Sequence, residues 1–262
     1  MFNDKVILIT GASSGLGREL AINLSQLNAK LGLMARRQDE LEKTKSLCLT
    51  RDKFLNPSIL LIQGDVTQAS DCAAAVNQTI NQFGQLDYLI LNAGVSMWSR
   101  FDAVQDIELF RRLIEVNYLG AVQPIFYALP HLKKTNGMIV AISSTQGKIA
   151  IPYHTGYSAS KHALEGFLDA LRLEECQINI LTVAPGWIEG TNLKNNAYKN
   201  GEKTRHSASK REVLTAQSCA KSIVNAIKNR ENNLVLPTKY RLLPFIKLLS
   251  PALLNWLIQR RM

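Results

Sequence analysis

The chain has 262 residues, of which 46% are hydrophobic and 20% charged, with a formal net charge of +10. This composition is typical of a globular protein with a sizeable core, and it excludes a disordered chain. The basic residues are spread along the chain without an arginine–aromatic platform or a helix-turn-helix pattern, so the charge does not predict a nucleic-acid partner.

Short aliphatic runs alternate with longer segments of helical periodicity. We predict strands at 5–10, 30–35, 59–64, 86–91, 137–143, 178–183 and 233–237, and helices at about 15–28, 38–51, 68–83, 105–132, 157–175 and 212–229. Strands buried on both faces give near-continuous apolar runs, as in "YLILNAG" and "MIVAISS". The alternation predicts an α/β fold, a doubly wound parallel sheet of about seven strands with helices on both faces. We expect one domain at 1–240 and an apolar, basic tail at 241–262.

The cysteines and the N-terminus bear on the compartment. Cys48, Cys72, Cys176 and Cys219 are far apart and form no CxxC pair. Their spacing matches neither a zinc site nor a disulfide framework, so we expect no metal and a reducing, cytoplasmic environment. An apolar run begins at Val6. We therefore expect no signal peptide or N-terminal anchor.

A glycine-rich turn joins the first predicted strand to the first predicted helix in "LITGASSGLGREL". Gly11 permits a tight turn, Gly15 lets the backbone approach a pyrophosphate, and Gly17 allows close packing of helix on strand. The spacing is GxxxGxG rather than GxGxxG, and three glycines could form only a turn. Their place in the first βαβ unit favours a Rossmann-like dinucleotide site. Its predicted members are Gly11, Ser13, Ser14, Gly15, Leu16 and Gly17.

The end of the second strand bears on the choice of dinucleotide. An acid there favours NAD, whereas arginine favours the 2′-phosphate of NADP. The sequence "GLMARRQDE" places Arg36 and Arg37 at this point. We predict NADP(H) rather than NAD(H), with Arg36 as the main phosphate contact; two solvated arginines opening a helix are the alternative. Asp65, followed by Val66, could reach an adenine rim or cap the next helix.

Tyr157 and Lys161 stand four residues apart in "TGYSASKHAL", which places them on one face of a helix. A tyrosine pKa is ordinarily about 10. An ammonium and a positively charged nicotinamide ring would lower it towards the operating pH of a general acid–base catalyst. One YxxxK pair is weak, because chance supplies it often. Ser144, at the end of a buried strand, could donate to a substrate carbonyl, and Asn117 could hold a water on a proton path to Lys161.

In the order of its motifs, the chain resembles a classical short-chain dehydrogenase/reductase over residues 4–237. The matching stretches are 10–17, Asp65, Asn92-Ala93-Gly94, Asn117, Ser144, 157–161 and Pro185-Gly186. The resemblance implies that Tyr157 is the catalytic acid/base and that Ser144 orients the substrate carbonyl. Lys161 would lower the pKa of Tyr157 and hold the nicotinamide ribose. Asn117 would complete the proton relay.

The resemblance also implies further cofactor contacts. Asn92, Ala93 and Gly94 would shape the strand end beside the adenine ribose, and Asn92 and Asn117 could be chiefly structural. The backbone after Pro185-Gly186, at Ile188, would hold the nicotinamide carboxamide. The family commonly has a threonine four residues after this glycine, whereas Thr191 stands at five. That spacing weakens the assignment of Thr191 to the cofactor.

Two segments depart from the alternation of strands and helices. Residues 190–211 are polar and basic, with Gly201 as a hinge candidate, where relatives carry a substrate lid. This segment would attract an acidic or thioester substrate, or act only as a solvated flap. The tail is interrupted by Pro244, Lys247 and Pro251, which excludes a membrane span. It could lie on a membrane surface, cover the substrate pocket or pack against another subunit.

These features predict an NADP(H)-dependent oxidoreductase that interconverts a ketone or aldehyde and an alcohol. Similarity to the steroid-, retinoid- and lipid-handling branch favours a lipophilic or bulky substrate. The resemblance implies a homodimer or homotetramer formed through the helices that contain Asn117 and Tyr157. The alternative is a catalytically silent nucleotide-binding protein, regulatory or a membrane-surface scaffold. The retention of Asn117, Ser144, Tyr157 and Lys161 disfavours it.

Overall fold

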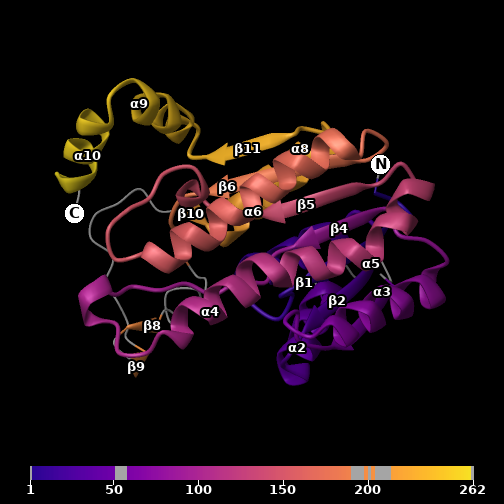
Figure 1. Cartoon of the computed structure of the whole chain (residues 1–262). Helices are drawn as coiled ribbons and strands as arrows, with labels where there is room; N and C mark the ends of the chain where they lie inside the picture. Colours follow the sequence, from indigo (N-terminus) through magenta and orange to yellow (C-terminus); the bar gives the residue numbers. More distant parts are fainter. Residues whose placement is uncertain (1, 51–57, 190–197, 200–201, 204–213, 261–262) are drawn as a thin grey trace.

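The computed structural model describes residues 2–50, 58–189, 198–199, 202–203 and 214–260. Seven parallel strands form one sheet in the order β11-β6-β5-β4-β1-β2-β3 (Figure 1). They are β1 (Val6–Thr10), β2 (Lys30–Ala35), β3 (Ile59–Gln63), β4 (Tyr88–Leu91), β5 (Met138–Ile142), β6 (Asn179–Pro185) and β11 (Asn233–Leu236). The predicted doubly wound sheet and each of its seven strands are confirmed.

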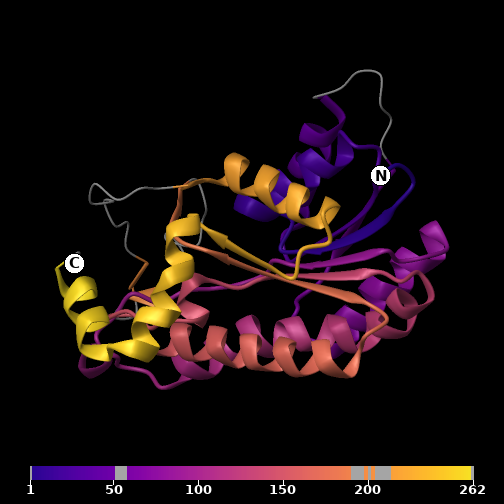
Figure 2. The same ribbon diagram turned by 90° about the horizontal axis from the view of Figure 1, so that it is seen from above.

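Helices cover both faces of this sheet, which lies between them in Figure 2. One layer contains α1 (Gly15–Ser25), α2 (Gln38–Thr50) and α8 (Ala216–Lys228). The other contains α3 (Ala69–Phe83), α5 (Gly120–Lys134) and α6 (Thr155–Glu174). Alternate residues of β1 serve the two layers: Ile7 and Ile9 join the core under α1 and α8, and Val6 and Leu8 join the core under α3 and α6. Burial on both faces explains the continuous apolar runs of the strands.

The predicted helix at 105–132 is wrong in one respect, because it is divided into three parts. They are α4 (Glu108–Ile114), a π-helical turn η2 (Glu115–Leu119) and α5. The wider turn occurs at Asn117, whose amide bonds the backbone of Val95 at 2.9 Å through both its oxygen and its nitrogen. Apolar periodicity alone does not distinguish a π turn from an α turn. π turns inside helices are frequent at functional sites.

Hydrogen bonds between β1 and β4 fix the glycine-rich turn. The hydroxyl of Thr10 accepts from the N–H groups of Asn92 and Ala93 at 3.1 and 3.3 Å. The Asn92 side chain donates back to the carbonyls of Thr10 and Gly11 at 3.2 and 3.0 Å. Gly17 must remain small, because a Cβ there would overlap the Asn92 amide and the Gly11 carbonyl. The strand end that faces the site is therefore rigid.

The C-terminal tail lies beside the carboxyl ends of the strands (Figure 1). It consists of a 3-10 turn η4 (Thr238–Leu242) and the helices α9 (Leu243–Leu249) and α10 (Pro251–Gln259). Pro244 and Pro251 stand in the first turns of α9 and α10, where a missing N–H costs no helical hydrogen bond. Within the described residues, no helix combines the length and apolar character that crossing a bilayer requires.

We predict that Thr10→Val destabilises the protein by about 1–3 kcal/mol, because the backbone N–H groups of Asn92 and Ala93 lose a buried acceptor. Urea denaturation measures the loss. Thr79→Val is the matched control: Thr79 is also fully buried, but its hydroxyl bonds only the Ala75 carbonyl of its own helix. An equal loss in both variants would contradict the role of Thr10.

Candidate active site

Tyr157 and Ser144 meet at the carboxyl edge of the sheet. Tyr157 lies in the first turn of α6 and is 5% exposed. Ser144 follows β5, and its side chain is hydrogen-bonded to that of Tyr157. The Gln146 N–H donates to Ser144 Oγ at 3.1 Å, as part of the 3-10 turn η3 (Thr145–Gly147). This bond from the backbone orients the serine, so that its O–H can point at the phenol.

Burial controls the protonation of Tyr157 and Lys161. It raises the pKa of Tyr157 to about 12, and the hydrogen bond from Ser144 acts in the opposite direction. Burial lowers the pKa of Lys161 to about 8, against the charge of Glu165. In the protein without cofactor the net shift of the tyrosine pKa is thus upward, and the lowering by Lys161 together with a bound nicotinamide stays a prediction. Desolvation exceeds the attraction of an ammonium that lies 5.9 Å from the ring centroid.

Lys161 lies beside Gly94 and Asn117. Its ammonium donates to the Ile142 carbonyl at 2.9 Å. A Cβ on Gly94 would lie 3.2 Å from Asn117 Oδ1 and 4.0 Å from Lys161 Nζ, so the three residues surround one point. The Asn117 amide also donates to Ser160 Oγ at 2.9 Å. Asn117 thus joins the loop after β4 to α6, a structural role that sequence reasoning allowed, and the water relay remains a prediction.

The glycine-rich turn has the properties of an anion site. Gly11 and Gly15 have φ of +67° and +53°, a region that favours glycine. Ser14 precedes α1, and its side chain makes no capping hydrogen bond. It therefore leaves the first N–H groups of the helix available to a ligand. Ser13 and Leu16 are buried and hold the turn in place. Backbone N–H groups at a helix start bind phosphates, and a ligand can approach them closely here because glycine has no Cβ. The turn therefore fits a dinucleotide diphosphate.

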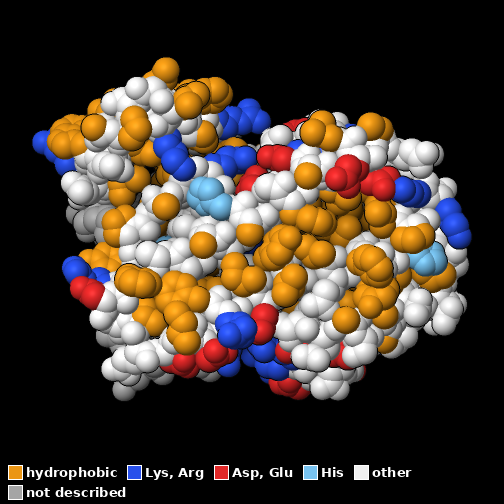
Figure 3. Space-filling view, in the orientation of Figure 1, with side chains coloured by type: hydrophobic (Ala, Val, Ile, Leu, Met, Phe, Trp, Pro, Cys, Tyr) orange, Lys and Arg blue, Asp and Glu red, His pale blue; other side chains and the backbone are white. Residues whose placement is uncertain are grey.

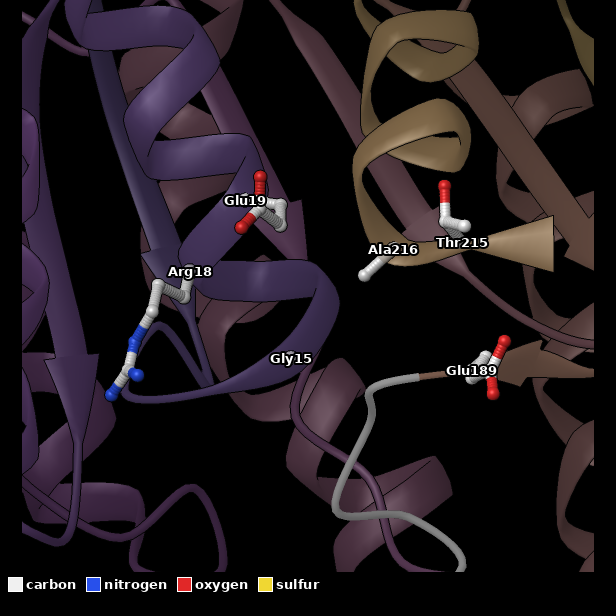
Figure 4. Close-up of a pocket in the computed structure, with 6 residues that line it drawn as sticks. All are labelled: Gly15, Arg18, Glu19, Glu189, Thr215 and Ala216. Atoms are coloured by element: carbon white, nitrogen blue, oxygen red, sulfur yellow. The ribbon is translucent and has the colours of Figure 1, made fainter. Parts of the chain in front are cut away.

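A cavity of about 340 Å³ adjoins this turn (Figure 4). It lies between the start of α1 and the start of α8, with Glu189 from β7 (Ile188–Glu189) on a third side. Its lining residues are Gly15, Arg18, Glu19, Glu189, Thr215 and Ala216. Because Glu19 and Glu189 repel anions, a diphosphate fits at the glycine backbone rather than between these two side chains.

The adenosine end of the predicted site contains an arginine and an acid. Arg36 Nη1 lies 3.6 Å from Asp65 Oδ2, and the arginine side chain is 70% exposed. Arg37 is also exposed. By contrast, Arg18 bonds Glu40 at 2.7 Å and Thr44 at 3.0 Å, so its guanidinium is already engaged.

Asp65 does not cap α3, which corrects that alternative. The helix starts at Ala69, with Gln68 at its N-cap position. Asp65 Oδ1 instead accepts from the N–H and the hydroxyl of Thr67, both at 3.0 Å. Val66 is buried against Gly120 and closes this side of the strand end.

The turn at Pro185-Gly186 lies against the tail. Pro185 ends β6, and the Gly186 N–H donates to the Leu236 carbonyl at 2.6 Å. A Cβ on Gly186 would lie 2.9 Å from the Tyr240 ring. Ile188 begins β7, which pairs with β10 (Leu214–Thr215). Thr191 and most of the predicted lid lie outside the described residues, of which β8 (Tyr198–Lys199) and β9 (Glu202–Lys203) pair antiparallel.

An aromatic cluster that sequence reasoning missed stands next to Tyr157. We define it as Trp98, Tyr153, His154 and Trp187. The Trp98 ring centroid lies 4.8 Å from His154, 5.7 Å from Tyr153 and 5.7 Å from Trp187. His154 in turn lies 6.1 Å from Tyr157.

Two features tie this cluster to the site. Tyr153 has φ +68°, a strained conformation for a bulky residue, and its carbonyl accepts from the Ser99 N–H at 2.9 Å. Each member also follows or precedes a motif: Trp98 comes four residues after Gly94, and Trp187 directly after Gly186. That adjacency was the available sequence signal, but it does not show that separate loops converge.

Comparison with known proteins agrees with this geometry. The sequence model of the short chain dehydrogenase family matches residues 5–202. The chain is similar to 11-beta-hydroxysteroid dehydrogenase 1A of Arabidopsis thaliana, with 35% identity over 96% of this chain and 74% of the relative. It is 36% identical to 11-beta-hydroxysteroid dehydrogenase-like 4A of the same plant, over 96% and 83%. An alcohol dehydrogenase from the archaeon Thermococcus sibiricus, solved with 5-hydroxy-NADP, superimposes with TM-score 0.77 at 26% identity, over 90% and 97% of the two chains.

The family match covers more than half of the chain, and the fold, the order of motifs and the meeting of Ser144, Tyr157 and Lys161 agree with it. The chain belongs to the short-chain dehydrogenase/reductase family, and it is an oxidoreductase of the branch that includes steroid dehydrogenases.

Proposed function

We propose that the protein is an NADP(H)-dependent oxidoreductase that interconverts a lipophilic ketone or aldehyde and the corresponding alcohol. The observation that carries this proposal is the buried Tyr157, which is hydrogen-bonded to Ser144. Its ring centroid lies 5.9 Å from the buried Lys161 ammonium. A catalytically silent binding protein has no need to keep a phenol and an ammonium in a desolvated site, since burying both is costly.

The mechanism assigns one task to each side chain. When bound, the nicotinamide dinucleotide supplies or takes up the hydride. During reduction, Ser144 donates a hydrogen bond to the substrate oxygen and polarises the carbonyl. Tyr157 then gives its proton to that oxygen, which becomes the alcohol, and Lys161 stabilises the phenolate left behind. Oxidation reverses these proton transfers.

The high pKa of the Tyr157 phenol explains why Lys161 must be charged in this mechanism. A phenol whose pKa is about 12 carries its proton at neutral pH, as an acid must, but it releases that proton reluctantly and is scarcely present as the phenolate that a base requires. A positive charge nearby stabilises the phenolate and lowers that pKa. A bound oxidised nicotinamide would add a second positive charge. We expect the tyrosine to become an efficient base only in the complex.

Cofactor preference rests on Arg36. Its side chain is 70% exposed at the end of β2, and its charged partner within the described ranges is Asp65, at a long 3.6 Å. A 2′-phosphate there would gain a charge-assisted hydrogen bond. The 5-hydroxy-NADP bound by the Thermococcus sibiricus relative supports the same choice.

A lipophilic substrate is supported by the aromatic cluster. Trp98 and Trp187 offer broad apolar faces against His154, which contacts Tyr157, and Tyr153 stacks on Trp98. Such faces pack well against flat ring systems. The steroid-dehydrogenase names of the plant relatives agree with a substrate of this kind.

We also propose that the tail rests on an anionic membrane surface. Its inner side packs on the protein, where Leu243 and Pro244 border Thr145, Lys148 and Ile149. Its outer side exposes large apolar side chains, visible in Figure 3 at the end of the molecule where the tail lies: Leu242, Phe245, Leu248, Leu249, Leu253 and Trp256. Arg260 lies 4.4 Å above the Trp256 ring, and no acid follows Glu231. Apolar side chains among cations are typical of segments at the interface of anionic bilayers.

Self-association through α5 and α6 completes the proposal. These helices and the adjoining π turn expose Leu119 and Phe126 beside the paired rings of Tyr118 and Phe167. Burial of these side chains in a homodimer or homotetramer would remove an exposed apolar patch.

We predict that Tyr157→Phe lowers turnover at least about 100-fold, because the proton donor is lost, while the dissociation constant for NADPH changes less than about twofold. Oxidation of NADPH by a panel of steroid and other lipophilic ketones measures turnover, and fluorescence titration measures binding. Tyr88→Phe is the control, because Tyr88 is about as buried as Tyr157 but lies at the start of β4, away from the carboxyl ends of the strands. Parallel losses of turnover and NADPH binding would reject the assigned role.

We predict that Arg36→Ala weakens NADPH binding about 10- to 100-fold, the effect of losing a charge-assisted hydrogen bond of about 1.5–3 kcal/mol. NADH binding should change less than about twofold, because NADH lacks the 2′-phosphate. Arg111→Ala, an exposed arginine paired with Glu108, should alter neither constant. If NADPH and NADH are affected alike, the cofactor assignment is wrong.

We predict that Leu249→Ser combined with Trp256→Ser reduces co-flotation with phosphatidylserine vesicles at least about fivefold. Both side chains are exposed, so the fold should persist. Leu173→Ser, which removes an exposed leucine on α6, is the control. Neutral phosphatidylcholine vesicles should bind the unaltered protein weakly. Equal flotation of the double variant and the control would rule out the tail as the contact.

A further inference from the structure

Glu165 places a carboxylate next to the proton-transfer site. It stands four residues after Lys161 on α6, so the two side chains share one face of the helix. Glu165 is 6% exposed, which is unusual for an acid. None of the family motifs named above includes this position.

The carboxylate is held in place from the other side by the turn η3. Glu165 Oε2 lies 3.1 Å from Lys148 Nζ. A Cβ on Gly147 would lie 2.9 Å from Glu165 Cγ and 3.1 Å from its Oε1, so the glycine leaves room for the acid. This is the turn whose N–H orients Ser144. Glu165 therefore contacts the segment that positions the substrate-orienting serine.

The hydrogen bonding of Glu165 is incomplete. Its Oε1 is buried and has no hydrogen-bond partner within the described part of the chain, and the same holds for the nearby Ser143 hydroxyl. A buried acid that serves only packing is costly, and an apolar side chain of similar volume would often be more stable. The presence of this buried acid therefore points to a role for its negative charge.

Lys161 is the group on which that charge acts. The ionisable residues on elements packed against α6 are Lys148 beyond η3, Glu115 and Tyr118 in η2, and Glu108, Arg111 and Arg112 in α4. Besides Lys161 and Glu165, α6 itself carries Tyr157, His162, Asp169, Arg172 and Glu174. Among the described residues, Glu165 is the one charged group that opposes the desolvation of Lys161. Lys148, at 29% side-chain exposure, neutralises the acid from the solvent side.

We propose that Glu165 is a positioning residue that keeps the buried ammonium of Lys161 protonated while Tyr157 exchanges its proton. Because Lys161 is desolvated, it would otherwise lose its charge in the pH range where the phenolate needs a cation. Lys148 Nζ pairs with the carboxylate at 3.1 Å from the solvent side. The inference rests on the proposed role of Lys161, but its central statement concerns a protonation state that can be measured without turnover.

NMR of protein labelled with ¹³C at lysine Cε follows the titration directly, and Lys161→Met identifies the resonance. The unaltered protein should titrate near pH 8. Glu165→Gln should shift the midpoint about one pH unit lower, because an opposite charge that favoured the ammonium is removed. Glu165→Met, which replaces the acid by an apolar side chain, should shift it in the same direction. Glu165→Asp should largely restore the original midpoint.

Glu175→Gln is the matched control. Glu175 adjoins the C-terminal end of α6, ten residues or about 15 Å along the helix from Glu165, and it pairs with Lys133 at 2.6 Å. The Glu175→Gln substitution should leave the midpoint of the Lys161 titration unchanged. A folded Glu165→Gln or Glu165→Met protein with an unshifted midpoint would overturn the inference, as would an equal shift in Glu175→Gln. Failure of the proposed oxidoreductase function would instead appear as no oxidation of NADPH by the unaltered protein with any ketone of the panel, whatever the Lys161 midpoint.

Discussion

Desolvation of Tyr157 and Lys161 is the constraint on which the rest of the site depends. Burial raises the pKa of the phenol and lowers that of the ammonium, so each group is driven towards its neutral form. Proton transfer needs the opposite state at one moment, a phenolate beside a cation. Glu165 and Ser144 act against the effect of burial, and both contact the turn η3. In the proposed mechanism, these compensating groups therefore stand next to the pair that transfers the proton.

A second constraint is the rigidity of the strand ends. Asn92 fixes the glycine-rich turn to β4, and Asn117 fixes the loop after β4 to α6. The Asn92 amide donates two hydrogen bonds to backbone carbonyls that are distant in the sequence. The Asn117 amide bonds distant backbone through both its oxygen and its nitrogen. Such bonds tie the glycine-rich turn to β4 and the loop after β4 to η2 and α6. Asn117 lies within the π turn, and its amide makes both bonds to Val95 from there.

The strands were predictable because parallel strands buried on both faces have a simple apolar signature. β2, for example, has the predicted bounds of 30–35. The helix at 105–132 was not, since periodicity of apolar residues does not report a local change from α to π hydrogen bonding. The aromatic cluster was missed for a different reason. Trp98, Tyr153 and Trp187 lie in three separate loops, and only the packing of those loops brings their rings within 6 Å of a neighbour.

The sequence by itself determined the fold class, the order of the motifs and the identity of Ser144, Tyr157 and Lys161 as candidates, because these depend on local spacing and on apolar pattern. Tertiary structure decided what those residues experience. Burial raises the pKa of Tyr157 in the protein without cofactor. Contacts between distant segments pair Arg18 with Glu40 and place Gly147 and Lys148 against Glu165. Solvent exclusion and contacts between distant segments are properties of the folded chain, and no spacing along the sequence encodes them directly.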